Sequence, residues 1–324
     1  MVSYSDTKLL ETLISIDTQN PCASYNKILE FLEEYFSGKG ADIEHLGKNL
    51  IIIFGKPKLL LNAHMDTVKA TGWGSDPLKA KIENDRILGL GACDTKGNIY
   101  CIMKAIEPKP KNLMILFSVD EEHGAKPGSY DFTKTKHMKN IEKAIVMEPT
   151  ENKVIVKHPG YYEVCLTFTT KAAHSSVSAK NAICLAAESI IKIKKYYENR
   201  FNIGAISSSS DSACIVANEC RMKISIRTYD SYPTVLDRLK TLLPPDTTIE
   251  PAQIGPPFYN HSPFLTGGEA SFWSEAAILS THGINTIVYG AGSIQQAHQP
   301  DEYVSVESLD KCISFLKEIM EGQK

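Results

Sequence analysis

Five segments of this sequence carry residue types that bind divalent metal ions. The residues are His64 with Asp66, Asp94, Glu121 with Glu122, Glu148, and His298. Four of these segments follow apolar runs of strand character, at 59–61, 114–119, 144–147 and 286–289, whereas Asp94 lies in a glycine-containing turn at 89–94. In an open α/β sheet, ligands bind beyond the carboxyl ends of the strands. The spacing therefore predicts that all five segments converge on one sheet edge as a catalytic metal site.

Taken singly, each residue also has a structural interpretation. A lone His at a strand end is more often a hydrogen-bonding residue than a ligand. Asp94 alone suits a turn or a helix cap, and Glu121, Glu122 and Glu148 suit acidic loops. The pair His64 and Asp66 is more specific, because an acid two residues away can bind the second ring nitrogen and fix the tautomer.

The combined set offers two histidines and three or four carboxylates, without a thiolate. Mixed nitrogen and oxygen ligation of this kind suits Zn²⁺, Co²⁺ or Mn²⁺. With one shared carboxylate it can hold two metal ions about 3.5–4 Å apart, which lower the pKa of a bridging water and polarise a carbonyl. A free Glu beside them would move the proton to the leaving amine. The chemistry indicated is metal-assisted amide hydrolysis.

The elements that must position these residues alternate between strands and helices. Helices are expected near 9–14, at 28–38 and at 98–106, and strand-type runs fill much of 50–119. This order is typical of βαβ units with a buried, mostly parallel sheet. Further on, a helix at 269–282, a strand at 285–289 and a closing helix at 306–320 are expected.

A different pattern occupies the middle of the chain. Half-exposed strands at 161–168 and 222–227 alternate with helices at about 180–197 and 234–243, and a proline-rich stretch at 244–263 follows. This favours a small α+β unit inserted into a discontinuous larger domain. We expect a metal-binding catalytic domain of residues 1–158 plus 264–324, and a small inserted domain of residues 159–263. The expected fold class is α/β, with a mixed, mostly parallel sheet flanked by helices.

Bulk composition narrows the function classes. The chain has 324 residues, 43% of them hydrophobic and 23% charged, with a net charge of −3. No basic block suggests nucleic acid as a partner, and no apolar run approaches the roughly 20 residues of a membrane span. Eight scattered Cys without a C-x-x-C favour a reducing cytoplasm over a disulfide framework.

Several motifs resemble one known family. LLNAHMDTV at 60–68, GACDTKG at 91–97, DEEHG at 120–124 and MEPT at 147–150 are similar to those of the M20 metallopeptidases and deacylases. The match keeps the family's order over nearly the whole chain. The segment GAGSIQQAHQPDEY at 290–303 resembles the acetylornithine deacetylase branch in particular, as does Glu269 with Ala270.

The resemblance implies a role for each candidate residue. One metal ion would be held by His64, Asp94 and Glu148, and the other by Asp94, Glu122 and His298. Glu121 would be the general base, Asp66 would orient His64, Arg227 would bind the substrate carboxylate, and Glu269 would pair with a cationic side chain. His174 would act in a partner subunit's site, which implies a homodimer in which residues 159–263 form the lid and dimerisation domain. The structural alternative for His174 is a cap or core His. Relatives carry an Asn thirteen residues before the position of Arg227, where this chain has Cys214. The segment before His64 is also shorter in this chain than in its relatives.

The function implied is a cytoplasmic deacylase that uses two divalent ions, zinc with cobalt able to substitute, to remove acetyl from N2-acetylornithine in arginine biosynthesis. The nearest alternative is the same chemistry on another small-molecule N-acyl amino acid, such as succinyl-diaminopimelate, or on a dipeptide. An oxidoreductase is disfavoured because Asp94 stands where a dinucleotide loop needs its third glycine. A non-catalytic binding protein is disfavoured because every ligand position and the base are present.

Overall fold

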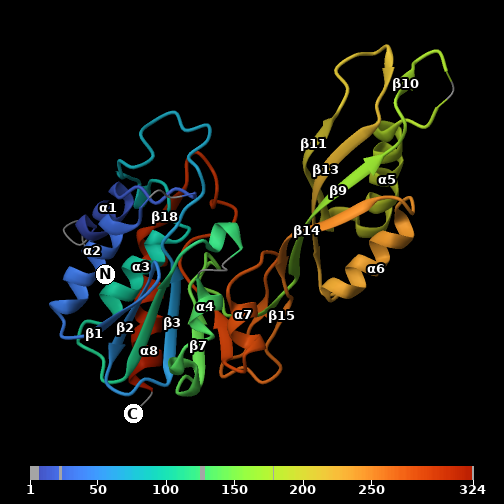
Figure 1. Cartoon of the computed structure of the whole chain (residues 1–324). Helices are drawn as coiled ribbons and strands as arrows, with labels where there is room; N and C mark the ends of the chain where they lie inside the picture. Colours follow the sequence, from blue (N-terminus) through green and yellow to red (C-terminus); the bar gives the residue numbers. More distant parts are fainter. Residues whose placement is uncertain (1–6, 22–23, 125–127, 178, 323–324) are drawn as a thin grey trace. The chain divides into compact units, whose positions relative to one another are not determined.

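The computed structural model describes residues 7–21, 24–124, 128–177 and 179–322 (Figure 1). Contacts divide the chain into two compact units. Unit 1 comprises Met1–Lys157 and Phe258–Lys324, and unit 2 comprises His158–Pro257. The residues Phe258 to Pro263, expected in the inserted segment, group with unit 1. Among the described residues, no helix is both long and apolar enough to cross a membrane.

Unit 1 is an α/β unit. Its helices are α1 (Lys8–Ser15), α2 (Asn26–Ser37), α3 (Lys96–Ala105), α4 (Ser129–Phe132), α7 (Ala276–Thr281) and α8 (Val306–Glu321), with 3-10 turns at Glu121–His123 and Lys136–Lys139. Its strands are β1 (Asp42–Leu46), β2 (Asn49–Phe54), β3 (Leu59–His64), β4 (Lys81–Glu83), β5 (Arg86–Leu88), β6 (Leu113–Ser118), β7 (Lys143–Val146), β8 (Ile155–His158), β15 (Phe258–Tyr259), β16 (Gly268–Glu269), β17 (Asn285–Val288) and β18 (Tyr303–Ser305).

The main sheet of unit 1 has the order β1-β2-β6-β3-β7-β17-β8-β15, with β16 paired to β8. The four central strands β6, β3, β7 and β17 run parallel, whereas β1, β2 and β8 pair antiparallel to their neighbours. Every residue of β3 and of β6 is buried, as expected for parallel strands covered on both faces. The prediction of a mixed, mostly parallel sheet flanked by helices is confirmed.

Helices cover both faces of this sheet. Leu59, Leu61 and Ala63 share one apolar core with residues of α1, α2, α3 and α8. The alternate strand residues are also buried, and α7 contacts β7 and β17. The strands β18, β5 and β4 form a separate three-stranded sheet. Of these strands, β18 directly precedes α8 in the chain. The hydroxyl of Ser305 caps α8 by accepting from the N–H of Ser308, which stabilises the helix start directly after β18.

Unit 2 combines an antiparallel sheet with two helices. Its elements are β9 (Gly160–Thr169), β10 (Ala173–His174), α5 (Ala182–Tyr197), a 3-10 turn at Glu198–Arg200, β11 (Phe201–Ser208), β12 (Ile215–Val216), β13 (Glu219–Thr228), α6 (Tyr232–Leu242) and β14 (Thr248–Gly255). The four-stranded sheet has the order β11-β13-β9-β14, and β10 pairs with β12. Alternate residues of β9 and β13 form a core with α5 and α6.

Two expected elements differ from the structure. The helix expected at 269–282 is shorter, since α7 covers only Ala276–Thr281, and Glu269 lies in β16 instead of at a helix start. The proline-rich stretch contains a strand, β14, in which Pro251 adjoins a register shift toward Gln253. A proline fits a strand at such an irregularity, where its missing N–H costs no ladder hydrogen bond.

Candidate metal centre

The four central strands each deliver a candidate ligand at their carboxyl ends. His64 is the last residue of β3, Glu122 lies in the turn after β6, Glu148 follows β7, and His298 lies in the loop after β17. Because these strands are parallel neighbours, their carboxyl ends meet at one edge of the sheet. Asp94 reaches the same place from the turn that precedes α3.

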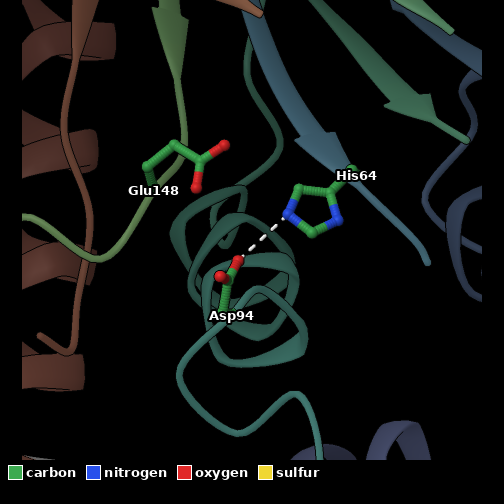
Figure 2. A group of neighbouring side chains, drawn as sticks. All are labelled: His64, Asp94 and Glu148. Atoms are coloured by element: carbon green, nitrogen blue, oxygen red, sulfur yellow. Dashed lines mark hydrogen bonds and ion pairs between the residues drawn. The ribbon is translucent and has the colours of Figure 1, made fainter. Parts of the chain in front are cut away.

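The first group of side chains consists of His64, Asp94 and Glu148. Their nearest ligand-type atoms lie within 4.8 Å of one another, and Figure 2 shows the three side chains directed toward a common point. The Nε2 atom of His64 is 3.0 Å from Oδ1 of Asp94. The Oε1 atom of Glu148 is buried and has no hydrogen-bond partner among the described residues. A buried carboxylate oxygen without a partner is costly unless a cation or a donor satisfies it.

The second group consists of Asp94, Glu122 and His298, again within 4.8 Å. The Nε2 atom of His298 is 3.0 Å from Oε1 of Glu122 and 3.5 Å from Oδ2 of Asp94. The Asp94 carboxylate thus directs one oxygen to His64 and the other to His298. It is the member common to both groups.

The electrostatics of the two groups call for added positive charge. Burial raises the pKa of Glu148 well above its ordinary value, and the charges of Asp94 and Glu121 raise it further. Burial also raises the pKa of Glu122. Hydrogen bonds to Asp94 and Glu122 raise the pKa of His298 to about 11. Divalent ions would stabilise all these carboxylates in the charged form.

The donor set fits such ions. Each group offers one imidazole nitrogen and two carboxylates, which is the mixed ligation of catalytic zinc sites. The partnerless oxygen of Glu148 supplies a ligand atom that the protein itself leaves unsatisfied. The arrangement suits two neighbouring divalent ions that share Asp94.

The orientation of His64 depends on the main chain more than on the expected acid. Its Nδ1 atom lies 2.9 Å from the backbone carbonyl oxygen of Asp66 and 3.6 Å from the carboxylate Oδ1 of Asp66. The carbonyl is therefore the closer acceptor for the Nδ1 proton, and it fixes the tautomer that leaves Nε2 free for a metal ion. Burial would lower the pKa of His64, but hydrogen bonds to Asp66 and Asp94 raise it well above the ordinary value.

The Asp66 carboxylate has another set of contacts. Its oxygens accept hydrogen bonds from the backbone N–H groups of Glu121 and Glu122, at 3.2 and 3.1 Å, and from Nδ2 of Asn20 at 2.9 Å. Asp66 is fully buried, so these bonds form in a low dielectric where they are strong. Asp66 thereby holds the turn that carries two of the predicted site residues.

Glu121 belongs to neither ligand group. Burial raises the pKa of its carboxyl well above the ordinary value; the His64 charge opposes this, and the Glu122 charge adds to it. Glu121 directly precedes the candidate ligand Glu122 in the same 3-10 turn. A carboxylate with a raised pKa that is not a ligand suits proton transfer near neutral pH.

Three polar residues around the centre were not singled out from the sequence. Asn20 binds Asp66 as described, and Glu275 accepts from the hydroxyl of Ser118 at 2.6 Å. Glu302 accepts from backbone N–H groups of the Asp94 turn. Burial raises the pKa of Glu302 to about 7. Of these three, only Glu302 lies in a motif that the sequence analysis identified, the segment at 290–303 that also contains His298.

A small cavity of about 240 Å³ opens beside Glu122. Its lining consists of Asn20, Pro21, Val68, Lys69, Glu122 and His123.

The remaining predicted residues lie elsewhere. In unit 2, exposed His174 accepts or donates a hydrogen bond between Nδ1 and the hydroxyl of Ser176 at 2.8 Å. Cys214 lies beside it, because its carbonyl accepts from the N–H of Ser175. The guanidinium of Arg227 stacks over the ring of Tyr161, with Cζ 4.8 Å from the ring centre.

Glu269, in unit 1, is exposed and already has a cationic partner. Its Oε2 atom lies 2.7 Å from Nζ of Lys157. A cationic substrate side chain would have to compete with Lys157 for this carboxylate.

Comparison with known proteins agrees with the geometry. Residues 60–322 match the family described as Peptidase family M20/M25/M40. The chain is 27% identical to an N-acetyl-L-citrulline deacetylase of Xanthomonas campestris pv. campestris, over 97% of this chain and 96% of that protein. It is 30% identical to an acetylornithine deacetylase of Aliivibrio fischeri, over 91% and 90%. Its fold is similar to the crystal structure of a tripeptidase from Staphylococcus aureus, with a TM-score of 0.80, 19% identity, and coverage of 99% and 100%.

Proposed function

This chain belongs to peptidase family M20/M25/M40 and is a metal-dependent hydrolase of amide bonds; on that premise we propose that it removes the acetyl group from N2-acetylornithine. The products would be ornithine and acetate, a step of arginine biosynthesis. The observation that carries the hydrolytic part is the Asp94 carboxylate shared by two ligand groups. The motif around His298 and the relative named acetylornithine deacetylase support the substrate.

We propose that His64, Asp94 and Glu148 hold one divalent ion and that Asp94, Glu122 and His298 hold a second. Zinc suits these ligands, and cobalt can substitute because it accepts the same donors. When bound, the two ions supply positive charge that polarises the amide carbonyl and acidifies water.

The proton transfers fall to Glu121. Its half-buried carboxylate takes the proton of the attacking water and holds it, as its raised pKa allows. The same oxygen then delivers the proton to the nitrogen of the leaving amine. Asp66 keeps Glu121 in place by accepting the hydrogen bond of its backbone N–H.

Substrate contacts from unit 2 complete the proposal. Arg227 would bind the substrate carboxylate, for which its planar guanidinium provides two parallel donors. His174 of the partner subunit would stabilise the charge that develops on the carbonyl oxygen. This requires a homodimer.

A second candidate substrate is an acetylated amino acid with a neutral side chain. The ion pair of Glu269 with Lys157 favours it, because the pair leaves Glu269 less able to bind the ammonium group of ornithine. The relative named N-acetyl-L-citrulline deacetylase agrees with this alternative. If Glu269 does bind ornithine, Glu269→Gln should raise KM for acetylornithine more than for acetylmethionine. Equal effects would remove that role.

The test of the function is acetate release by chelator-stripped protein to which Zn²⁺ or Co²⁺ is added back. N-acetylornithine and N-acetylcitrulline are assayed in parallel. The substrate that releases acetate faster identifies the amino-acid side chain that the enzyme prefers. We expect release to depend on metal. If metal binds stoichiometrically but neither substrate yields acetate, the proposed substrates are wrong. Succinyl and formyl amino acids and dipeptides would then be tested.

A matched pair of variants separates chemistry from metal binding. Glu121→Gln should retain both ions and lose about 100- to 10,000-fold in kcat, the usual contribution of a general base. Glu122→Gln, one residue along the same turn, should instead lose an ion. Full activity of Glu121→Gln would contradict its role as the base.

A further inference from the structure

One buried carboxylate outside both ligand groups grips the turn that carries Asp94. The Oε1 atom of Glu302 accepts from the N–H groups of Cys93 and Asp94, at 2.8 and 2.9 Å, and Oε2 accepts from the N–H of Gly91 at 3.0 Å. Glu302 is only 1% exposed. Three backbone donors on one charged acceptor make strong, directional hydrogen bonds.

The main chain of Glu302 adds to this grip. Its carbonyl accepts from the N–H of Gly89 at 3.0 Å, so a single residue binds the turn at both ends. Its own N–H donates to the carbonyl of Gln299 at 3.1 Å. Gln299 directly follows His298. Glu302 therefore links the turn of Asp94 to the loop of His298.

The turn itself leaves little room for another arrangement. Gly91 has a φ of +80°, and a Cβ there would lie 2.9 Å from Cδ of Lys96 and 3.0 Å from Cγ2 of Thr67. Asn98 also joins the two segments, since its side chain binds the carbonyl of Cys93 and both backbone groups of Ala291. Asn98 does not bind the N–H of Asp94. Among the described contacts, the side chain that does so is that of Glu302.

We propose that Glu302 is a positioning residue of the metal centre, which sets the Asp94 carboxylate between the two ligand groups and fixes its spacing to His298. The inference rests on the proposed two-ion site but not on the substrate. Glu302 supplies no ligand atom, so its effect is exerted through the backbone of residues 91–94. Because Glu302 fixes the backbone of Asp94, the Asp94 side chain loses less conformational freedom when an ion binds. The affinity for the ion is therefore higher.

The test is a Co²⁺ titration of metal-free protein, followed by visible absorption and by the count of ions retained after dialysis. In Glu302→Gln, an NH2 group replaces one carboxylate oxygen and the negative charge is lost. When that NH2 group faces the N–H of Gly91, two donors meet and this hydrogen bond is lost. We expect Co²⁺ affinity to fall about 10- to 100-fold, the usual cost of losing a residue that orients ligands, and the absorption band to change shape. In turnover assays, kcat should fall while KM changes little.

The matched control is Glu275→Gln. Glu275 is a second buried carboxylate near the centre, and it accepts from the hydroxyl of Ser118 and the N–H of Ser129. Its variant removes the same charge from the same unit without touching the Asp94 turn. We expect its Co²⁺ affinity to exceed that of Glu302→Gln at least about tenfold. Equal losses in the two variants would show a general charge effect and overturn the positioning role.

Glu302→Asp keeps the test open if the Gln variant does not fold. Its carboxylate retains the charge but is one methylene too short to reach all three amides. An intermediate affinity is expected, and unchanged affinity with native thermal stability would overturn the proposal. If the unaltered protein binds no Co²⁺ at all, the proposed metal centre fails instead, so the two failures are distinguishable.

Discussion

The Nε2 atom of His64 lies 3.0 Å from Oδ1 of Asp94, although thirty residues separate them in the chain. His64 ends the strand β3, and Asp94 precedes the helix α3. The second oxygen of Asp94 points to His298, which comes from the other end of the sequence. One carboxylate therefore contacts two segments that lie far apart in the chain.

The shared position of Asp94 predicts unequal effects of removing single ligands. Asp94→Asn should lower the affinity for both ions by at least about a hundredfold, because both groups lose a charged ligand. Glu148→Gln should release one ion and leave the group of Asp94, Glu122 and His298 able to bind the other. The measurement is metal content after dialysis.

Asp301→Asn is the control for that experiment, because Asp301 is exposed and lies three residues after His298. It should retain both ions. If Asp94→Asn lost only one ion, the carboxylate would not be shared and the two-ion arrangement would be wrong.

Asp66 is predicted to act on the turn of Glu121 and Glu122 more than on His64. In Asp66→Asn the backbone carbonyl at position 66 still accepts from Nδ1 of His64, but one acceptor of the turn is lost. The ion bound by His64 should therefore remain, while the ion bound by Glu122 weakens about 10- to 100-fold. Stepwise Co²⁺ titration distinguishes the two sites. A larger loss at the His64 site would restore the side chain of Asp66 as the residue that orients His64.

The sequence predicts the sheet and its ligand-bearing strand ends because four of the five ligand-bearing segments follow an apolar run, so that strand and candidate ligand are visible in one short segment. Glu302 and Asn20 could not be assigned roles in this way. Glu302 binds the N–H of Asp94 across 208 residues, and Asn20 binds Asp66 across 46. Such contacts depend on tertiary packing, for which a single sequence carries no local periodicity. The strand β14 was missed for a related reason, since Pro251 breaks the pattern that would indicate it.

His158 is predicted to make the stability of the protein depend on pH. Burial, together with the positive charge of Arg227, lowers the pKa of His158 from 6.5 to about 4. Above pH 6.5 the ring is neutral in both states, so the folded state has its full stability. As the pH falls from 6.5 to about 4, the unfolded chain binds a proton on this ring that the folded state excludes. The free energy of unfolding should therefore drop by an amount on the order of 3 kcal/mol.

Urea unfolding of the metal-free protein across the window from pH 6.5 to about 4 measures this dependence. His158→Gln should reduce the slope, because no ring is left to titrate at this position. His282→Gln should keep the slope of the unaltered protein, since His282 is exposed. Equal slopes for all three proteins would show that His158 does not control the acid sensitivity.

The proposed action of His174 in the partner's site predicts complementation between two inactive variants. His174→Ala lacks the residue that a subunit lends, and Glu121→Gln lacks the base that a subunit keeps. In a mixed dimer, the site of the His174→Ala subunit receives an intact His174 from its partner and still has its own Glu121. Co-expression of the two chains with different tags allows the mixed dimer to be purified.

Random pairing of equal amounts gives half mixed dimers with one working site each, so the mixture should recover about one quarter of the original activity. If His174 instead acted within its own chain, each site of the mixed dimer would lack one residue and no activity would return. Recovery also requires that His174 be available to a second chain. Its exposed ring agrees with that requirement, because the described contacts of the ring are local ones of Nδ1 with the hydroxyl and the backbone N–H of Ser176. A fully active monomer would exclude the shared site, because no second chain would then be needed.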